Sequence, residues 1–268
     1  MSLRIQNNVE AFNAQRQLVH NSDKLGKAME KLSSGYRINR AGDDAAGLAI
    51  SEKLRGQING LAQASRNSSD AVSLVQTAEG ALNEVHSMLQ RVRELAVQYK
   101  NGSLSASDQT AIQNEVTQLA NEIERIGKTA QFNGIKLLDN TNAVTFQVGS
   151  QDGDEIAVTM ITLGASVGAS YSTLAVGGTQ DITEIDNAIN AVSAQRASLG
   201  GIQNRLEHSL SAAGTYEENL IAAESRIRDV DMAAEMVEYT KYSILAQAGQ
   251  AMLAQANQAP ASVLSLLQ

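Results

Sequence analysis

Cysteine and tryptophan are both absent from the 268 residues. Without thiols the chain can form no disulfide and no thiolate metal site, so cysteine usage says nothing about its compartment. Proline occurs once, at Pro260, and aromatic residues make up only 3% of the chain. Broad globular cores normally contain large aromatic side chains, whereas thin seams between helices are filled by aliphatic ones. With 43% hydrophobic residues, the composition favours an elongated helical bundle.

Basic residues are fewer than acidic ones, 21 against 29, which gives a formal net charge of −8. An acidic chain disfavours sequence-independent binding to nucleic acid. Residues 1–40 nevertheless have a charge balance of +4, and residues 221–268 one of −2. The two ends could attract each other, or these could be two unrelated solvated faces.

No apolar run reaches the roughly 18 residues that a membrane span requires, so no membrane insertion is expected. The first twenty residues also differ from a cleavable signal peptide, because Arg4, Glu10 and Arg16 interrupt their apolar residues. These features are typical of a cytoplasmic protein, but they leave open export by a route that reads no cleaved signal.

The strongest pattern predicts one long helix from Asp43 to Tyr99. Two adjacent apolar stripes follow it in steps of four and three. The first contains Leu54, Ile58, Leu61, Val72, Val75, Leu82 and Leu89, and polar Ser65, Ser68 and Glu79 interrupt it. The second has no gap and contains Ala71, Leu74, Ala78, Ala81, Val85, Met88, Val92, Leu95 and Tyr99. Residues at such spacing share a helical face, so two stripes require two neighbouring helices. We expect one stripe to face a helix containing Ile112–Ile126, which Ser105 caps, and the other to face a helix over Ile185–Ile227.

Between these helices the apolar period changes to two. Val144, Phe146 and Val148 alternate with polar residues, and so do Ile156, Val158 and Met160. This pattern predicts a small β-hairpin, preceded by a turn at Asn133 and Gly134. The following Gly164–Thr179 is rich in Gly, Ser and Thr, which predicts a surface loop.

The two terminal helices carry more apolar surface than one partner can cover. The first is predicted over Leu3–Leu32, and the last from about Met232, with a kink or restart at Pro260. Pairing with each other would cover one face of each, and the remaining face needs other copies of the chain. The residues predicted to make these assembly contacts are Leu18, Leu25, Leu32, Ile244, Leu245, Leu253, Leu264 and Leu267.

No catalytic, cofactor or metal site is predicted. The three histidines are far apart in the sequence and lie in no zinc motif. Gly127, Lys128 and Thr129 resemble the end of a phosphate-binding loop, but they follow a helix and lack its first glycine, so a helix end is the better interpretation. Asp43 or Asp44 is expected to cap the long helix rather than to act as half of an acid–base pair.

Six long motifs of the chain resemble those of one protein family. They are LSSGYRINRAGDDAAGLAIS (32–51), QRVRELAVQ (90–98), QFNGIKLL (131–138), ASLGGIQNRLEHSL (197–210), ENLIAAESRIRDVDMAAEM (218–236) and QANQAPASVLSLL (255–267). In this order they resemble bacterial flagellin over nearly the whole chain. Many members of the family have large variable domains, and only Gly164–Thr179 stands in their place here, which is too short for a catalytic insert. The segment Ser211–Thr215 also departs from the family pattern, which suggests a local break near Gly214.

The resemblance implies a mainly α, hairpin-shaped subunit. Residues 1–42 and 226–268 would pair as an inner coiled-coil domain. Residues 43–179 would form the N-terminal half of a rod domain, with the long helix, the second helix, the β-hairpin and the loop, and residues 180–225 its C-terminal helix.

The resemblance further implies a structural subunit of the extracellular flagellar filament, exported unfolded through the flagellar type III apparatus. Its partners would be further copies, an export chaperone at the C-terminal region, and the filament cap and hook-junction proteins. A hook–filament junction protein is the nearest alternative. From other classes, an enzyme on the same scaffold lacks a catalytic insert, and a cytoplasmic coiled-coil signalling module would form soluble dimers.

The family also activates the innate immune receptor Toll-like receptor 5 (TLR5). The resemblance transfers this contact to Arg91, Leu95 and Glu115 of a released monomer. Arg91, Glu94 and Leu95 are also interpreted as a polar edge of the long helix that contacts another subunit.

Overall fold

A computed structural model describes residues 8–139, 143–160, 162–163 and 181–266, with the side chains of 181 and 259–266 left out. The helices are α1 (Val9–Ser34), α2 (Ala45–Tyr99), α3 (Ala106–Thr129), α6 (Asp181–Arg228) and α7 (Met232–Leu266). The strands are β1 (Gln131–Phe132), β2 (Ile135–Lys136), β3 (Val144–Gln147) and β4 (Glu155–Val158). The predicted mainly α fold with a small β-hairpin is confirmed. The predicted loop Gly164–Thr179 lies outside the described residues.

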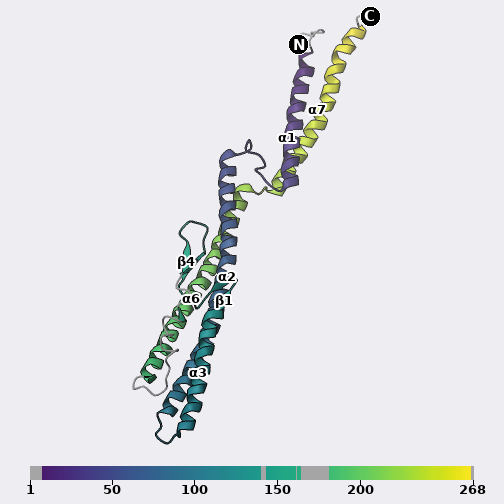
Figure 1. Ribbon diagram of the computed structural model, residues 1–268. Helices are drawn as coiled ribbons and strands as arrows, with labels where there is room; N and C mark the ends of the chain where they lie inside the picture. Colours follow the sequence, from purple (N-terminus) through teal and green to yellow (C-terminus); the bar gives the residue numbers. More distant parts are fainter. Residues whose placement is uncertain (1–7, 140–142, 161, 164–180, 267–268) are drawn as a thin grey trace. The chain divides into compact units, whose positions relative to one another are not determined.

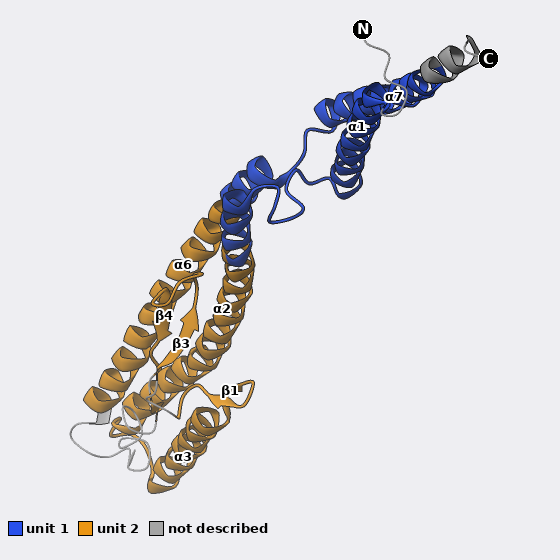
Figure 2. Ribbon diagram, turned by 90° about the horizontal axis from the view of Figure 1, so that it is seen from above, with its two compact units in different colours: residues 1–56, 219–268 blue, residues 57–218 orange. Residues whose placement is uncertain are grey.

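The chain forms two compact units (Figure 2). Unit 1 contains residues 1–56 and 219–268, and unit 2 contains residues 57–218. The helices α2 and α6 each contribute to both. The predicted segments 1–42, 43–179, 180–225 and 226–268 stay a prediction, because a division by compactness does not locate the ends of a coiled-coil domain.

The core of unit 2 gathers both apolar stripes of α2 from Ala71 onward. Leu82, Val85 and Val92 are 0% exposed, and Leu89 1%. They pack in one cluster with residues of α3 and α6, including Ile123 and Leu199. Figure 2 shows α3 and α6 packed along α2 within this unit. Two stripes on one long helix therefore meet two neighbouring helices, as the stepping predicts.

Polar residues that interrupt the first stripe find partners within the fold. Ser68 is fully buried, and its hydroxyl donates to the carbonyl of Ala64 at 2.9 Å. Glu79 forms an ion pair with Arg196 of α6 at 3.7 Å. A buried hydroxyl that bonds its own helix leaves no unsatisfied donor, so the stripe tolerates the interruption.

Helix ends follow local chemistry. Ser105 and Asp108 form a reciprocal capping box at the start of α3. The carboxylate of Asp44 accepts from Gly47 N at 2.8 Å and so caps α2. Gly35 ends α1 in the left-handed conformation at φ 75°, which only glycine adopts readily. The Gly127–Thr129 segment closes α3, which confirms its interpretation as a helix end.

The predicted hairpin is formed by β3 and β4, which pair antiparallel with Phe146 opposite Ile156. Ile156 and Val158 are buried in the core of unit 2, so the hairpin packs on the helices through one face. A second, shorter hairpin joins β1 to β2. Its turn residues, Asn133 (φ 48°) and Gly134 (φ 80°), have the positive φ values that a two-residue hairpin turn requires.

In unit 1, α1 and α7 run side by side (Figure 1). They are antiparallel, because Asn8 Nδ2 donates to the carbonyl of Ala256 at 2.8 Å while Lys31, at the other end of α1, lies 3.5 Å from Glu235. The predicted pairing of the terminal helices is therefore confirmed.

Two local expectations were wrong, at Gly214 and at Pro260. The predicted first helix is present from Val9, after the N-cap Asn8, and residues 3–7 of the prediction lie outside the described residues. No break occurs near Gly214, since α6 is continuous to Arg228. A helical glycine costs about 1 kcal/mol, which the remainder of so long a helix offsets. Likewise α7 continues past Pro260 to Leu266, so the predicted restart is absent, while the alternative of a kink stays a prediction.

Candidate functional site

The contact between α1 and α7 is a seam in which small and large side chains are mixed. On both helices the less exposed positions recur in steps of three and four, the spacing of a coiled coil. They are Ala11, Ala14, Leu18, Asn21, Leu25, Ala28 and Leu32 on α1, and Glu235, Tyr239, Tyr242, Ala246, Gly249, Leu253 and Ala256 on α7. At one close point, a Cβ added to Gly249 would lie 3.3 Å from Leu18 Cδ1.

The structure divides the predicted assembly residues into two groups. Leu18, Leu25, Leu32 and Leu253 belong to the seam within the chain. Ile244 and Leu245 lie outside it and are 60% and 40% exposed. The side chain of Leu264 and the whole of Leu267 lie outside the described residues. A role for any of these residues between subunits stays a prediction.

The outward faces of α1 and α7 are unusually apolar. Ten large hydrophobic side chains of these helices are each at least 40% exposed. They are Val9, Phe12, Val19, Met29, Met232, Met236, Val237, Ile244, Leu245 and Met252. A set of this size on two paired helices marks an interaction surface rather than scattered exposure. We call these ten residues the outer apolar face.

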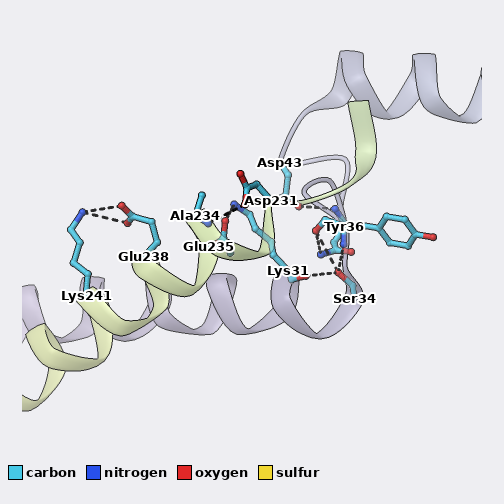
Figure 3. Close-up of polar contacts among 10 residues, drawn as sticks. Lys31, Ser34, Tyr36, Asp43, Asp231, Ala234, Glu235, Glu238 and Lys241 are labelled. Atoms are coloured by element: carbon cyan, nitrogen blue, oxygen red, sulfur yellow. Dashed lines mark hydrogen bonds and ion pairs between the residues drawn. The ribbon is translucent and has the colours of Figure 1, made fainter. Parts of the chain in front are cut away.

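Polar contacts hold the end of this helix pair (Figure 3). The Asp231 carboxylate accepts from the backbone of Ala233 and Ala234 at 2.9 and 3.1 Å, which caps α7. Beside it, Lys31 reaches across from α1 to Glu235. The pair is partly exposed, so it fixes register more than it stabilises the fold.

In unit 1, an unpredicted cluster around Arg228 links the segment that follows α1 to the segment between α6 and α7. The guanidinium lies 4.7 Å from the centre of the Tyr36 ring and 2.9 Å from Glu52. Backbone bonds link the same segments, since Arg37 N donates to Arg228 O at 2.7 Å and Val230 N to Gly35 O at 3.0 Å. Burial raises the pKa of Glu52, but hydrogen bonds from Arg228 and Arg55 outweigh this and lower it overall.

The sequence gives little sign of this cluster, because its members are far apart along the chain. The cation–π contact and the ion pair join residues separated by more than half of the chain length. Only the run RIRDVD before α7, which concentrates charge at a helix end, marks the region.

The polar edge of α2, predicted to contain Arg91, Glu94 and Leu95, differs from the prediction at one residue. Arg91 is half exposed and binds Glu115 of α3 at 2.9 Å and Glu94 at 3.2 Å. The hydrogen bond that Arg91 donates to Glu115, followed by the one it donates to Glu94, raises the pKa of Arg91. Leu95 is only 2% exposed and belongs to the core, so its place on the polar edge was wrong. Four residues span only about 40° more than a turn, but this is enough to cross from solvent into the seam with α3.

A second ion pair lies on the other side of α2, where Arg93 binds Asp186 of α6 at 2.6 Å. At about 100° per residue, Arg91 borders the stripe that includes Leu95, whereas Arg93 borders the stripe that includes Leu89. These neighbours favour the prediction that the stripes face α3 and α6 respectively.

Within the described ranges there is no group of three metal-ligating side chains. Over the same part of the chain, none of the helices is long and apolar enough to cross a membrane. His86 has a hydrogen-bond partner on its own helix, since its Nε2 lies 3.0 Å from Gln90 Nε2.

Family models match most of the chain. Residues 5–143 match the bacterial flagellin N-terminal helical region, and residues 182–267 match the bacterial flagellin C-terminal helical region. The chain belongs to the bacterial flagellin family. This confirms the resemblance that the six motifs carry. Flagellins are structural proteins, and both ends of this chain contain the family's helical regions.

Similar flagellins cover almost the full length. The flagellin of Halalkalibacterium halodurans is 56% identical over 269 residues, with 98% of this chain and 99% of that protein covered. The flagellin of Bacillus subtilis is 49% identical over 303 residues, with 99% and 100% covered. A short flagellin without large variable domains fits these alignments.

Solved structures agree with the fold. The flagellin of Bacillus cereus has a TM-score of 0.51 at 31% identity, covering 55% of this chain and 88% of that one. A flagellar hook-associated protein from Vibrio parahaemolyticus has a TM-score of 0.53 at 16% identity, covering 70% and 100%. The second likeness concerns the fold alone.

Proposed function

We propose that this chain is the structural subunit that polymerises into the bacterial flagellar filament outside the cell. The observation that carries the proposal is the outer apolar face, which remains exposed although α1 and α7 already pair. Such a face can be covered by further copies in an open helical lattice, where each contact is heterologous and the assembly does not close.

The same lattice explains how weak contacts could give a stiff polymer. Each interior subunit would touch several neighbours at once, so its release requires several seams to open together. A hook–filament junction protein shares the paired terminal helices but would not form the bulk polymer. Relatives that match over their whole length and bear the name flagellin favour the filament subunit.

Polymerisation of the purified full-length chain tests the proposal. Concentrated protein should form long filaments in electron micrographs. Deletion of residues 259–268 should abolish stable filaments while unit 2 keeps its thermal melting transition. Soluble dimers at all concentrations, or normal filament yield from the deletion, would contradict the proposal.

Two matched variants of α7 sharpen the test. Val237→Asp adds a charge to the outer apolar face, where the valine is 68% exposed. Gln250→Asp adds the same charge at an exposed position that is already polar. We expect loss of polymer from the first variant and near-normal polymer from the second, because only the first buries a charge at a contact.

Other partners follow from the family. Unfolded export would need a chaperone that covers the C-terminal region, and the apolar residues of α7 suit such a role. The filament cap and hook-junction proteins would meet the same terminal helices. Recognition of a released monomer by TLR5 would use Arg91 and Glu115, which are exposed, whereas Leu95 would support them from the core.

A further inference from the structure

Methionine is the only sulfur-containing residue in this chain, which has seven methionines and no cysteine. The described methionines divide sharply between the two units. Met29, Met232, Met236 and Met252 in unit 1 are 53%, 49%, 49% and 63% exposed. In unit 2, Met160 is 5% exposed, and Met88 is partly buried against the core.

All four exposed methionines belong to the outer apolar face. Met232 and Met236 lie one turn apart on α7, and the antiparallel register places Met29 of α1 near the same end of the pair. Met252 lines an open hollow of about 400 Å³ together with Glu10 and Asn13. A molecule as small as a peroxide can therefore reach these thioethers while the face is uncovered.

We propose that Met29, Met232, Met236 and Met252 form an oxidation-sensitive site through which hydroperoxides block subunit addition. The inference rests on the proposed function, because it assumes that the outer apolar face is covered on polymerisation. Assembly would also protect the four thioethers by burying them.

The chemistry is a two-electron oxygen transfer. The thioether sulfur attacks one peroxide oxygen, the O–O bond breaks and an S–O bond forms. The sulfur is oxidised, and the hydroperoxide is reduced to water or an alcohol, with a proton moving to the departing oxygen. Because the chain holds no thiol, no cysteine competes for the oxidant.

Oxidation changes an adaptable apolar side chain into a polar one. A sulfoxide buried at a subunit contact without a hydrogen-bond donor opposes association. The methionines of unit 2 are shielded, so this unit should remain folded. The lesion would therefore act on assembly rather than on the fold.

Peroxide treatment of the full-length monomer tests the inference. After hydrogen peroxide is removed with catalase, peptide mass spectrometry should find sulfoxide at the four positions before it appears at Met160. The protein concentration needed for polymerisation should rise about tenfold or more, which corresponds to about 1.4 kcal/mol or more. Methionine sulfoxide reductase should reverse the effect, and the melting temperature of unit 2 should not change.

Leucine variants separate the four sites from general damage. Leucine has similar volume and helix propensity but no sulfur. The fourfold Met→Leu variant at positions 29, 232, 236 and 252 should polymerise equally with and without peroxide, whereas Met88→Leu with Met160→Leu should remain sensitive. If the fourfold variant does not polymerise at all, reversal by the reductase in the unsubstituted chain decides.

Two outcomes would overturn the inference alone: normal polymerisation of protein with confirmed sulfoxide at all four positions, or persistent peroxide sensitivity of the fourfold variant. Failure of the untreated chain to polymerise would instead overturn the proposed function, and this inference with it.

Discussion

Gly249 lies opposite Leu18 where α7 meets α1, and its replacement by leucine should separate the two helices. An added Cβ would lie 3.3 Å from Leu18 Cδ1, 3.8 Å from its Cβ and 4.0 Å from its Cα. The Cδ1 methyl can rotate away, but the Cβ and Cα are fixed by the helix. The three further carbons of a leucine would have to be fitted into this already close contact.

The sign of the effect distinguishes a packed helix pair from two separate helices. Forcing extra carbons into a formed seam costs about 1–3 kcal/mol. In an unpaired helix, exchange of glycine for leucine gains about 0.8 kcal/mol of helix propensity. Gly249→Leu thus destabilises α7 if the seam exists and stabilises it if α7 is alone.

Two further variants test the geometry. Leu18→Ala removes the side chain that meets position 249, so the double variant Leu18→Ala with Gly249→Leu exchanges the large and small partners. We expect it to recover about 1–3 kcal/mol relative to the sum of the single changes. Gly26→Leu is the matched control on α1, since no atom lies within 4 Å of its added Cβ.

Amide hydrogen exchange of α1 and α7 is the suitable assay, because it reports local opening free energy. Gly249→Leu should accelerate exchange by about 5- to 150-fold, the equivalent of 1–3 kcal/mol. Gly26→Leu should slow exchange slightly. Slower exchange in Gly249→Leu, or additivity of the double variant within about 0.5 kcal/mol, would refute the packed seam.

Two further predictions concern unit 2. Arg91→Glu should reduce filament yield but leave the melting temperature nearly unchanged, since ion pairs this exposed contribute little to folding; a lower melting temperature with normal polymer would assign the edge to the fold. Hydrogen bonds from the Ser105 side chain and backbone lower the pKa of Asp108, so its contribution to the stability of α3 is present above the unfolded pKa of about 3.9 and is lost as pH falls through the lower folded value. Thermal melts should therefore show an advantage of the native chain over Asp108→Asn at neutral pH that disappears in acid, and a difference independent of pH would contradict this role.

Features with local causes were predictable from the sequence. Ser105, Gly35 and Asp44 end or begin helices through contacts within a few residues. The apolar period of two identified β3 and β4, because a half-buried strand alternates its faces. The long helix was also clear, since α2 keeps its two stripes over many turns.

The seam of α7 could not be found in this way. This helix is apolar nearly all round, so no single face stands out in its sequence. Ile244 and Leu245 are large apolar residues, yet the positions that face α1 include Ala246 and Gly249. The partner selects the face, and Gly249 lies where a Cβ would already be 3.3 Å from Leu18 Cδ1 of α1. The cluster at Arg228 was missed for the related reason that its partners are distant along the chain.

The arrangement of large and small side chains sets the scale of self-association. The outer apolar face has ten large side chains, each at least 40% exposed. If full burial of such a side chain contributes about 1.5–3 kcal/mol, each has roughly 1 kcal/mol still to gain, or on the order of 10 kcal/mol in total.

Association of two proteins costs about 4–15 kcal/mol before side-chain ordering. A single contact that buries only part of this face is therefore near balance, and isolated dimers should be weak. A subunit that contacts several neighbours pays the cost of immobilisation once while burying the whole face. The same surface that gives little as a dimer interface can thus hold a subunit firmly in a lattice, which separates a filament protein from a dimeric coiled-coil module on energetic grounds.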